Sequence, residues 1–169
     1  FWSFGAYRNP RIRQSVKVLK IIHNTTPRVY VYYFEETSVT ISHPNFGSYT
    51  AFGTGIGSIA VSYANDVTIH DVASDLAVVV SKTAKRNGSV TFEIVQSSDF
   101  NDWMRRFANY IEQAATEEFA LATISISNRS TGDNYYCTGV SHRKKADNNF
   151  QSQAQNRSWE MMCASITQS

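Results

Sequence analysis

The chain has little that would commit it to metal, disulfide or membrane chemistry. Its two cysteines, Cys137 and Cys163, lie 26 positions apart without CxxC spacing. This spacing favours two buried thiols over a zinc cluster or a disulfide framework. No apolar run approaches the roughly 18 residues of a membrane span. Lys17 and Lys20 interrupt the N-terminal apolar residues that a signal peptide would need. We therefore expect a soluble protein, made inside the cell, with no membrane partner.

Acidic residues are absent from the first 28 positions, where six basic residues stand, whereas residues 29–169 carry ten basic and fourteen acidic side chains. We predict a basic N-terminal extension over residues 1–28, solvated or disordered, which is either mature sequence or lies upstream of the true start. Residues 29–169 are long enough to form one domain with its own core. Because affinity for DNA depends on neutralising several phosphates at once, the acidic balance of this domain argues against a built-in nucleic-acid grip.

Nucleotide-binding signatures are also absent, although Gly53, Gly55 and Gly57 alternate in AFGTGIGSIAVSY. A dinucleotide fingerprint needs a third glycine where Ser58 stands and a helix directly afterwards. A Walker loop needs Gly-Lys-Ser/Thr, which is missing. The residues after Ser58 alternate between apolar and small polar types, which is typical of a strand. We interpret the glycines as a supple loop or bulge where another backbone comes close.

Catalytic and metal-binding patterns are equally sparse. The stretch IHDVASD offers His70, Asp71 and Asp75, but no HExxH, EF-hand or Cys-His spacing accompanies them. On a strand, His70 and Asp71 would point to opposite faces. No nucleophile elbow is present either. The sequence therefore predicts no metal, no cofactor and no enzymatic activity.

A period of two is present over most of the chain. Alternating segments predict seven or so strands, near residues 29–41, 59–63, 75–83, 89–96, 119–127, 135–141 and 156–167. In the fourth segment Val90, Phe92 and Ile94 are expected to face the core. The KRNG stretch at residues 85–88 is typical of a hairpin turn.

The period changes once, over about residues 99–116. There Trp103, Phe107, Tyr110 and Ile111 recur every three to four residues and predict one apolar helix face packed on the core. Arg105 and Arg106 fall on the other side, toward solvent or toward the acidic residues of a neighbour in an assembly. The fold class expected is mainly β, an antiparallel β-sandwich or partial barrel with one packed α-helix.

Read in order, these segments resemble a bacteriophage tail tube protein over about Phe34 to Ser169. The resemblance rests on the stretch from FEETSVTISHPNFGSYTAFGTGIG to the VTIHDVASD segment, the KRNGSVTFEIVQSS entry, the aromatic helix in NDWMRRFANYIEQA, and a closing Q-x-x-N-x-x-W pattern. None of these is an active-site motif, so their order and spacing identify the family. The type that it resembles most is the major tail tube protein of long-tailed phages, in particular those with contractile tails.

The resemblance implies a structural virion protein. Such proteins form hexameric rings, with strands from each subunit joined into one inner barrel, and the rings stack into a tube for DNA ejection. The implied partners are other copies of the chain, a tape-measure protein in the lumen, baseplate and tail-terminator proteins, and a tail sheath in contractile tails. DNA would pass without specific binding, and the protein would be assembled in the bacterial host cytoplasm and located in the tail.

In this family a long loop reaches a neighbouring subunit or ring. We place that contact in the segment between residues 49 and 57, with the contact residues Tyr49, Phe52, Gly53, Gly55, Ile56 and Gly57. Two alternatives remain beside the phage tail tube. One is the inner tube of a contractile injection particle that delivers protein, and the other is a monomeric β-sandwich binding module. A hydrolase on a β-scaffold has the least support, because no poised nucleophile is visible.

Overall fold

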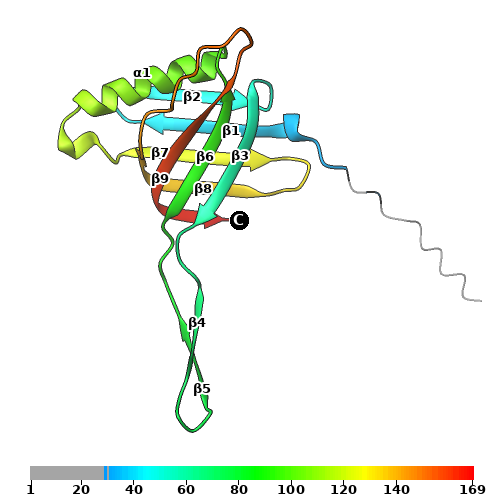
Figure 1. Ribbon diagram of the computed structural model, residues 1–169, viewed down its shortest axis with the longest axis vertical. Coiled ribbons are helices and arrows are strands. Elements are labelled where there is room, and N and C mark those ends of the chain that lie inside the picture. Colours follow the sequence, from blue (N-terminus) through cyan, green and yellow to red (C-terminus); the bar gives the residue numbers. More distant parts are fainter. Residues whose placement is uncertain (1–28, 30) are drawn as a thin grey trace, which may run out of the picture. The chain divides into compact units, whose positions relative to one another are not determined.

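The computed structural model describes residue 29 and residues 31–169 (Figure 1). The predicted basic extension over residues 1–28 lies outside the described residues. Among the described residues are nine strands, one α-helix and two short 3-10 helices. In chain order they are η1 (Phe34–Glu36), β1 (Thr37–His43), β2 (Gly47–Phe52), β3 (Ile56–Tyr63), β4 (Thr68–Val72), β5 (Val78–Lys82), β6 (Gly88–Val95), α1 (Asp99–Gln113), η2 (Thr116–Glu118), β7 (Ala122–Asn128), β8 (Asn134–His142) and β9 (Asn156–Gln168).

Seven of the strands form one antiparallel sheet in the order β2-β1-β7-β8-β9-β6-β3. The long strand β9 pairs with β8 through its C-terminal half and with β6 through its N-terminal half. The sheet curls along this strand, so that β3 and β6 run across the direction of β1, β2, β7 and β8 (Figure 1). The predicted mainly antiparallel β fold of the partial-barrel type, with one packed helix, is confirmed.

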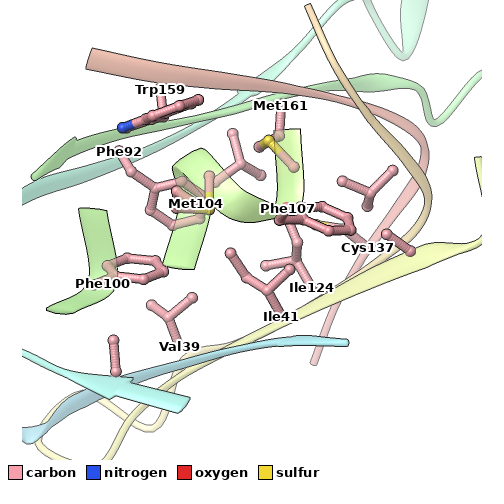
Figure 2. Packing of buried hydrophobic residues seen from close by; sticks show 14 of the residues in the cluster. Val39, Ile41, Phe92, Phe100, Met104, Phe107, Ile124, Cys137, Trp159 and Met161 are labelled. Carbon is pink, nitrogen blue, oxygen red and sulfur yellow. The ribbon is translucent and has the colours of Figure 1, made fainter. Parts of the chain in front are cut away.

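The alternation in the sequence places one face of this sheet in the core. Every second residue of β1 and of β6 is buried, and Val39, Ile41, Val90, Phe92 and Ile94 have no exposed surface. Figure 2 shows side chains from several strands and from α1 meeting in one cluster. Burial of these aliphatic and aromatic groups contributes about 1.5–3 kcal/mol per side chain, and it fixes the register of the strands.

Helix α1 packs in the concave side of the sheet because one of its faces is apolar. Ser98 caps the helix, since its Oγ accepts a hydrogen bond from the Asn101 backbone N–H at 3.2 Å. Asp99 and Asp102 in the first turn complement the helix dipole. The helix ends at Gln113, a few residues before the predicted 116, because the chain turns extended at Ala114 and then forms η2. No helix in the described part of the chain is long and apolar enough to cross a membrane.

The predicted hairpin turn at residues 85–88 is wrong. Strand β5 pairs with β4, and β6 pairs with β3, so the two segments that flank KRNG do not pair with each other. Gly88 is a glycine for another reason: a Cβ there would lie 2.1 Å from the Ser62 carbonyl oxygen. The strands β3 to β6 therefore form one very long hairpin. Its actual turn is at residues 73–77, where Leu76 has a φ of 67°.

Two strands are additional to the seven predicted. Strand β4 covers the TIHDV stretch, whose polar residues weaken the alternation, and β2 lies in a segment that we expected to be loop. Strand β2 is at the edge of the sheet, where only Ala51 is buried and Tyr49 is half-buried. An edge strand with so little buried surface leaves a weak periodic signal.

Candidate assembly surfaces

The outer part of the long hairpin is an arm, residues 64–87, that extends beyond the seven-stranded sheet (Figure 1). Its strands β4 and β5 pair only with each other among the described residues, and every residue in both strands is exposed. The arm nevertheless carries seven large exposed apolar side chains, Val67, Ile69, Val72, Leu76, Val78, Val79 and Val80. A lone two-stranded ribbon is marginally stable in water, and such an apolar surface usually marks an interaction site.

Charge on the arm is divided along its length. The outgoing strand and the turn carry Asp66, Asp71 and Asp75, and the returning strand carries Lys82, Lys85 and Arg86. Because Asp71 lies opposite Val79 and Lys82 lies opposite Thr68, the basic residues are near the root. Asp71 and Asp75 are therefore at the tip, without a basic residue between positions 67 and 81. The tip is thus both apolar and acidic.

The glycine segment contains more strand than we predicted, and the expected long loop over residues 49–57 is wrong. Tyr49 and Phe52 belong to β2, Ile56 and Gly57 belong to β3, and only residues 53–55 lie between the strands. The side chain of Tyr49 stacks on Phe100 of α1 with ring centroids 5.3 Å apart, and Ile56 is buried. Phe52 is the outward-facing apolar residue, 61% exposed.

The glycines themselves match the interpretation as a bulge with close backbone approach. A Cβ at Gly53 would lie 2.6 Å from both the Glu35 Cα and the Phe34 carbonyl oxygen. Gly55 has a φ of +88°, and the pairing of β3 with β6 shifts by one residue between Ile56 and Ser58. The turn is therefore fixed by the backbones beside it rather than free to cradle a phosphate.

The predicted helix face lies against the interior of the sheet. Trp103, Phe107 and Ile111 are buried, and Tyr110 is half-buried with its hydroxyl donating to Glu118 Oε2 at 2.8 Å. Trp103 and Phe107 stack at 5.1 Å, and Figure 2 shows Phe107 among residues of the core. On the outer side, Arg105 and Arg106 both bind Asp102, at 2.6 Å and 3.2 Å, and each arginine side chain is 60% exposed.

The convex face of the sheet over β1, β2, β7 and β8 carries no charged side chain. The strand registers place twelve residues on this face. They are Ser38, Thr40, Ser42, Ser48, Thr50, Phe52, Thr123, Ser125, Ser127, Asn134, Tyr136 and Thr138. We call it the hydroxyl face. A free protein surface is usually about one-quarter to one-third charged, whereas the centres of interfaces are depleted in charge. The composition of this face is therefore that of a contact surface.

The described residues contain no cluster of side chains arranged as a metal-binding or nucleophilic site. They include no group of three or more His, Cys, Asp or Glu side chains that could hold a metal ion. His70, Asp71 and Asp75 are spread along the exposed arm. Cys137 and Cys163 are free and buried, as expected, and contact with the Cys137 thiol together with burial raises the pKa of Cys163. Such a thiol is not a poised nucleophile.

The sequence matches one protein family over residues 29–169. That family is described as the bacteriophage PhiTE tail tube protein. The match covers all of the described residues, including the arm, the glycine turn and α1. No curated protein sequence matches the chain.

Several solved structures share the fold, among them the following three. A chain in the cryo-EM structure of an extracellular contractile injection system, the PVC sheath/tube terminator in the extended state, gives a TM-score of 0.53 at 10% identity, covering 83% of this chain and 98% of that chain. A chain in the PVC sheath-tube complex in the extended state gives a TM-score of 0.52 at 10% identity, covering 83% of this chain and 92% of that chain. A chain in the cryo-EM structure of the anti-feeding prophage baseplate gives a TM-score of 0.50 at 7% identity, covering 84% of this chain and 97% of that chain.

Proposed function

The chain belongs to the bacteriophage PhiTE tail tube protein family, and from this membership we propose that it assembles into hexameric rings that stack into a tail tube. Members of this family are structural proteins of the phage tail, so the chain is a virion tail component and not an enzyme. We further propose which surfaces join the copies, what the tube conducts and which partners it has.

The observation that carries the proposal is the arm. An extended ribbon with seven exposed apolar side chains has no role in the core of its own subunit. Contact with another copy would bury this surface. An arm that leaves one side of a subunit to contact a different surface on the next makes a heterologous contact, and repetition of such contacts gives an open helical filament.

The glycine turn is proposed as part of the same contact. Of the six residues Tyr49, Phe52, Gly53, Gly55, Ile56 and Gly57, only Phe52 offers a large exposed apolar side chain to a neighbour. Tyr49 and Ile56 pack inward and hold the turn in place. We expect the glycines to let Phe52 and the turn backbone lie close to the next ring.

The proposed tube would be wide enough to pass duplex DNA. If each of six subunits supplies four strands, about 24 strands spaced ~4.8 Å and tilted ~40° give a backbone diameter of roughly 48 Å. Side chains would leave a lumen on the order of 40 Å. The acidic balance of residues 29–169 supports passage without binding, because a surface of the same sign as phosphate repels it.

The remaining partners follow from this role. We propose a tape-measure protein in the lumen before ejection, tail-terminator and baseplate proteins at the two ends, a sheath in a contractile tail, and assembly in the cytoplasm of the host. A second candidate is the inner tube of a contractile injection particle, which is favoured by the fold shared with the PVC chains. A monomeric β-sandwich binding module is the alternative from another class.

Negative-stain electron microscopy and analytical ultracentrifugation of the purified chain test the proposal. We expect rings and tubes whose fraction rises with protein concentration. A matched variant replaces residues 66–85 by an Asn-Gly turn, which would join the paired ends of β3 and β6 directly. This variant should keep the circular dichroism signature of a folded β protein and lose stacked tubes, because β4 and β5 pair only with each other among the described residues.

One outcome would contradict the proposed function, and another would contradict only the role given to the arm. Uniform monomers of the intact chain at high concentration would favour the monomeric binding module. Normal tubes from the variant without the arm would leave the family role in place and would remove the arm from the stacking contact.

A further inference from the structure

The arm and helix α1 lie at opposite ends of the same pair of strands. Strand β6 begins at the arm with Gly88 and ends at Val95, and Ser98 then caps α1. A strand of this length spans roughly 25 Å. The glycine turn is at the α1 end as well, because Gly55 accepts a backbone hydrogen bond from Val95 and lies beside Ser98. Figure 1 shows the arm and α1 on opposite sides of the crossing strands.

In a contact between copies, the acidic tip of the arm is complemented best by a surface that carries positive charge. Three groups of neighbouring basic residues occur in the described part of the chain. The first, Lys82, Lys85 and Arg86, is at the root of the arm itself. In a ring the arms of all copies leave in the same direction, so the tip of one arm does not reach the root of the next. This group is therefore excluded as the acceptor.

The second group is balanced within its own subunit. Arg143, Lys144 and Lys145 bind three different carboxylates, those of Glu160, Asp147 and Glu112, at 2.8 Å, 3.1 Å and 2.6 Å. Each positive charge in this group thus has a negative charge beside it. Such a group offers little net attraction to an acidic partner.

The third group has a surplus of positive charge. Arg105 and Arg106 share the single carboxylate of Asp102, and both arginine side chains remain 60% exposed. They lie on α1, at the end of the molecule away from the arm. Asn109, one turn further along the helix, is also exposed and uncharged. Asp99, in the first turn, is exposed as well but forms no ion pair with either arginine in the described structure. The Arg105 and Arg106 pair therefore has one positive charge more than the carboxylate that it binds, and it lies where a head-to-tail contact requires it.

We propose that the tip of the arm, with Asp71, Asp75 and Leu76, docks on the Arg105 and Arg106 face of α1 in a second copy of this chain. Leu76 is 82% exposed at the tip and supplies apolar contact, and the two aspartates supply charge complementary to the arginines. Single exposed ion pairs are weak, but six such contacts per ring would act together. The charges would also select this head-to-tail orientation over other orientations. The inference rests on the proposed function, since it names the surface that receives the arm.

A charge exchange tests the docking. The variants Asp71→Lys/Asp75→Lys and Arg105→Glu/Arg106→Glu should each lower the amount of stacked tube at least about tenfold, since six contacts change at once. The quadruple variant reverses the charges on both partners, so opposite charges face each other again. It should restore the amount of stacked tube to within about threefold of the original chain. Glu117→Lys/Asp133→Lys makes the same change in net charge at exposed positions outside the arm and should assemble as the original chain does.

A cross-link provides a readout that does not depend on charge variants remaining assembled. Leu76→Cys combined with Asn109→Cys should form disulfide-linked ladders on oxidation of assembled tubes, and neither single variant should. The native cysteines are buried and should not contribute. Each variant is first compared with the original chain by thermal unfolding, so that loss of fold is separated from loss of docking.

The outcomes separate this inference from the proposed function. Normal tubes from both double variants, or no ladder from assembled Leu76→Cys/Asn109→Cys tubes, would overturn the docking and leave the tube role intact. Failure of the quadruple variant to assemble, with both doubles folded and impaired, would overturn the charge pairing. If the original chain itself never stacks, the proposed function fails, and the inference fails with it.

Discussion

At the scale of single residues, His43 shows how a buried polar side chain fixes two turns at once. It lies at the end of β1 and is 1% exposed. Its Nδ1 accepts hydrogen bonds from the backbone N–H groups of Asn45 and Phe46, both at 3.2 Å. The proton is therefore on Nε2, which donates to the Glu118 carbonyl oxygen at 2.9 Å. One imidazole thus holds the β1–β2 turn against η2.

Replacement of His43 should consequently destabilise the fold. We expect His43→Ala to lower the free energy of unfolding by about 2–4 kcal/mol, because it leaves two part-buried N–H donors without an acceptor and opens a cavity in place of a buried ring. Urea unfolding followed by tryptophan fluorescence measures the change. Asn45→Ala is the matched control, since it removes only the exposed hydrogen bond to Glu118 and should cost less than about 1 kcal/mol. A loss below that of the control would contradict the role given to His43.

His142 has a different environment: the residue is half-buried, but both of its ring nitrogens are buried. It packs against Phe107 and Trp159, with ring centroids 5.2 Å and 5.8 Å away, and neither ring nitrogen has a hydrogen-bond partner in the described structure. Burial lowers its pKa to about 4, with a smaller raising effect from Glu112 and a smaller lowering effect from Lys145. The ring is therefore neutral at pH 7.

This environment predicts a pH dependence of stability. Below about pH 6.5 the unfolded chain takes up a proton that the folded chain does not, so stability is lost as pH falls from about 6.5 toward about 4. The loss attributable to His142 should be about 3 kcal/mol over this range. Urea midpoints at several pH values measure it, with His142→Phe as the comparison, because carboxylates titrate in both proteins. Equal pH profiles for the two proteins would show that His142 is not buried in this way.

At the scale of elements, α1 and the curled sheet form one core. Trp103 stacks on Phe107 and also lies 5.5 Å from Phe46 and 5.7 Å from Tyr49, which belong to the β1–β2 hairpin. On the other side, Asn101 accepts a hydrogen bond from the Trp159 indole N–H at 3.0 Å. The helix is thus fastened both to β2 and to β9, the two separated parts of the sheet.

Truncation of Trp103 should therefore affect the whole domain. We expect Trp103→Ala to cost about 3–5 kcal/mol, as for other buried aromatic residues, and to lower the yield of soluble protein. Thermal unfolding of the purified variant, or its accumulation in cells if it does not purify, measures the effect. Asn109→Ala, on the exposed side of the same helix, should leave stability nearly unchanged. Normal tubes and an unchanged midpoint for Trp103→Ala would mean that the helix is not packed as described.

The elements that sequence reasoning predicted are those with two distinct faces. In β6, Val90, Phe92 and Ile94 alternate with polar residues because one side of that strand is buried, and in α1 the same cause gives a period near 3.6. The arm was not predicted as a paired unit, because all of β4 and β5 is exposed and no buried face imposes a pattern. The Asn-Gly pair at residues 87–88 led to the wrong prediction of a hairpin turn. Gly88 instead lies in a strand, where the close backbone of Ser62 leaves no room for a Cβ.

At the scale of the whole molecule, charge is distributed unevenly over the surface. The hydroxyl face spans four adjacent strands without a charged side chain, whereas acidic and basic residues lie on the arm, on α1 and in the loop over residues 143–155. Edge strands and free sheet faces usually carry charge that prevents unwanted association. The register that creates this face could not be predicted from the sequence, because β2 was expected to be loop.

The hydroxyl face should consequently tolerate charge in a free subunit and not in an assembly. Thr40 and Ser125 are opposite each other in the register of β1 and β7 and point outward. We expect Thr40→Lys/Ser125→Lys to change the free energy of unfolding by less than about 1 kcal/mol, since both positions are already in contact with water. The same variant should form few or no rings, because two like charges would have to be desolvated where subunits meet.

Sedimentation velocity separates these two effects, because it measures assembly in solution while urea unfolding of the same samples measures stability. Asn149→Lys/Gln151→Lys adds the same charge to the exposed loop over residues 143–155 and should assemble as the original chain does. If the Thr40→Lys/Ser125→Lys variant assembles like this control, the hydroxyl face remains in contact with solvent in the tube. Ring closure would then depend on the two unpaired edge strands, β2 and β3, because these would be the remaining long surfaces able to join one sheet to the next.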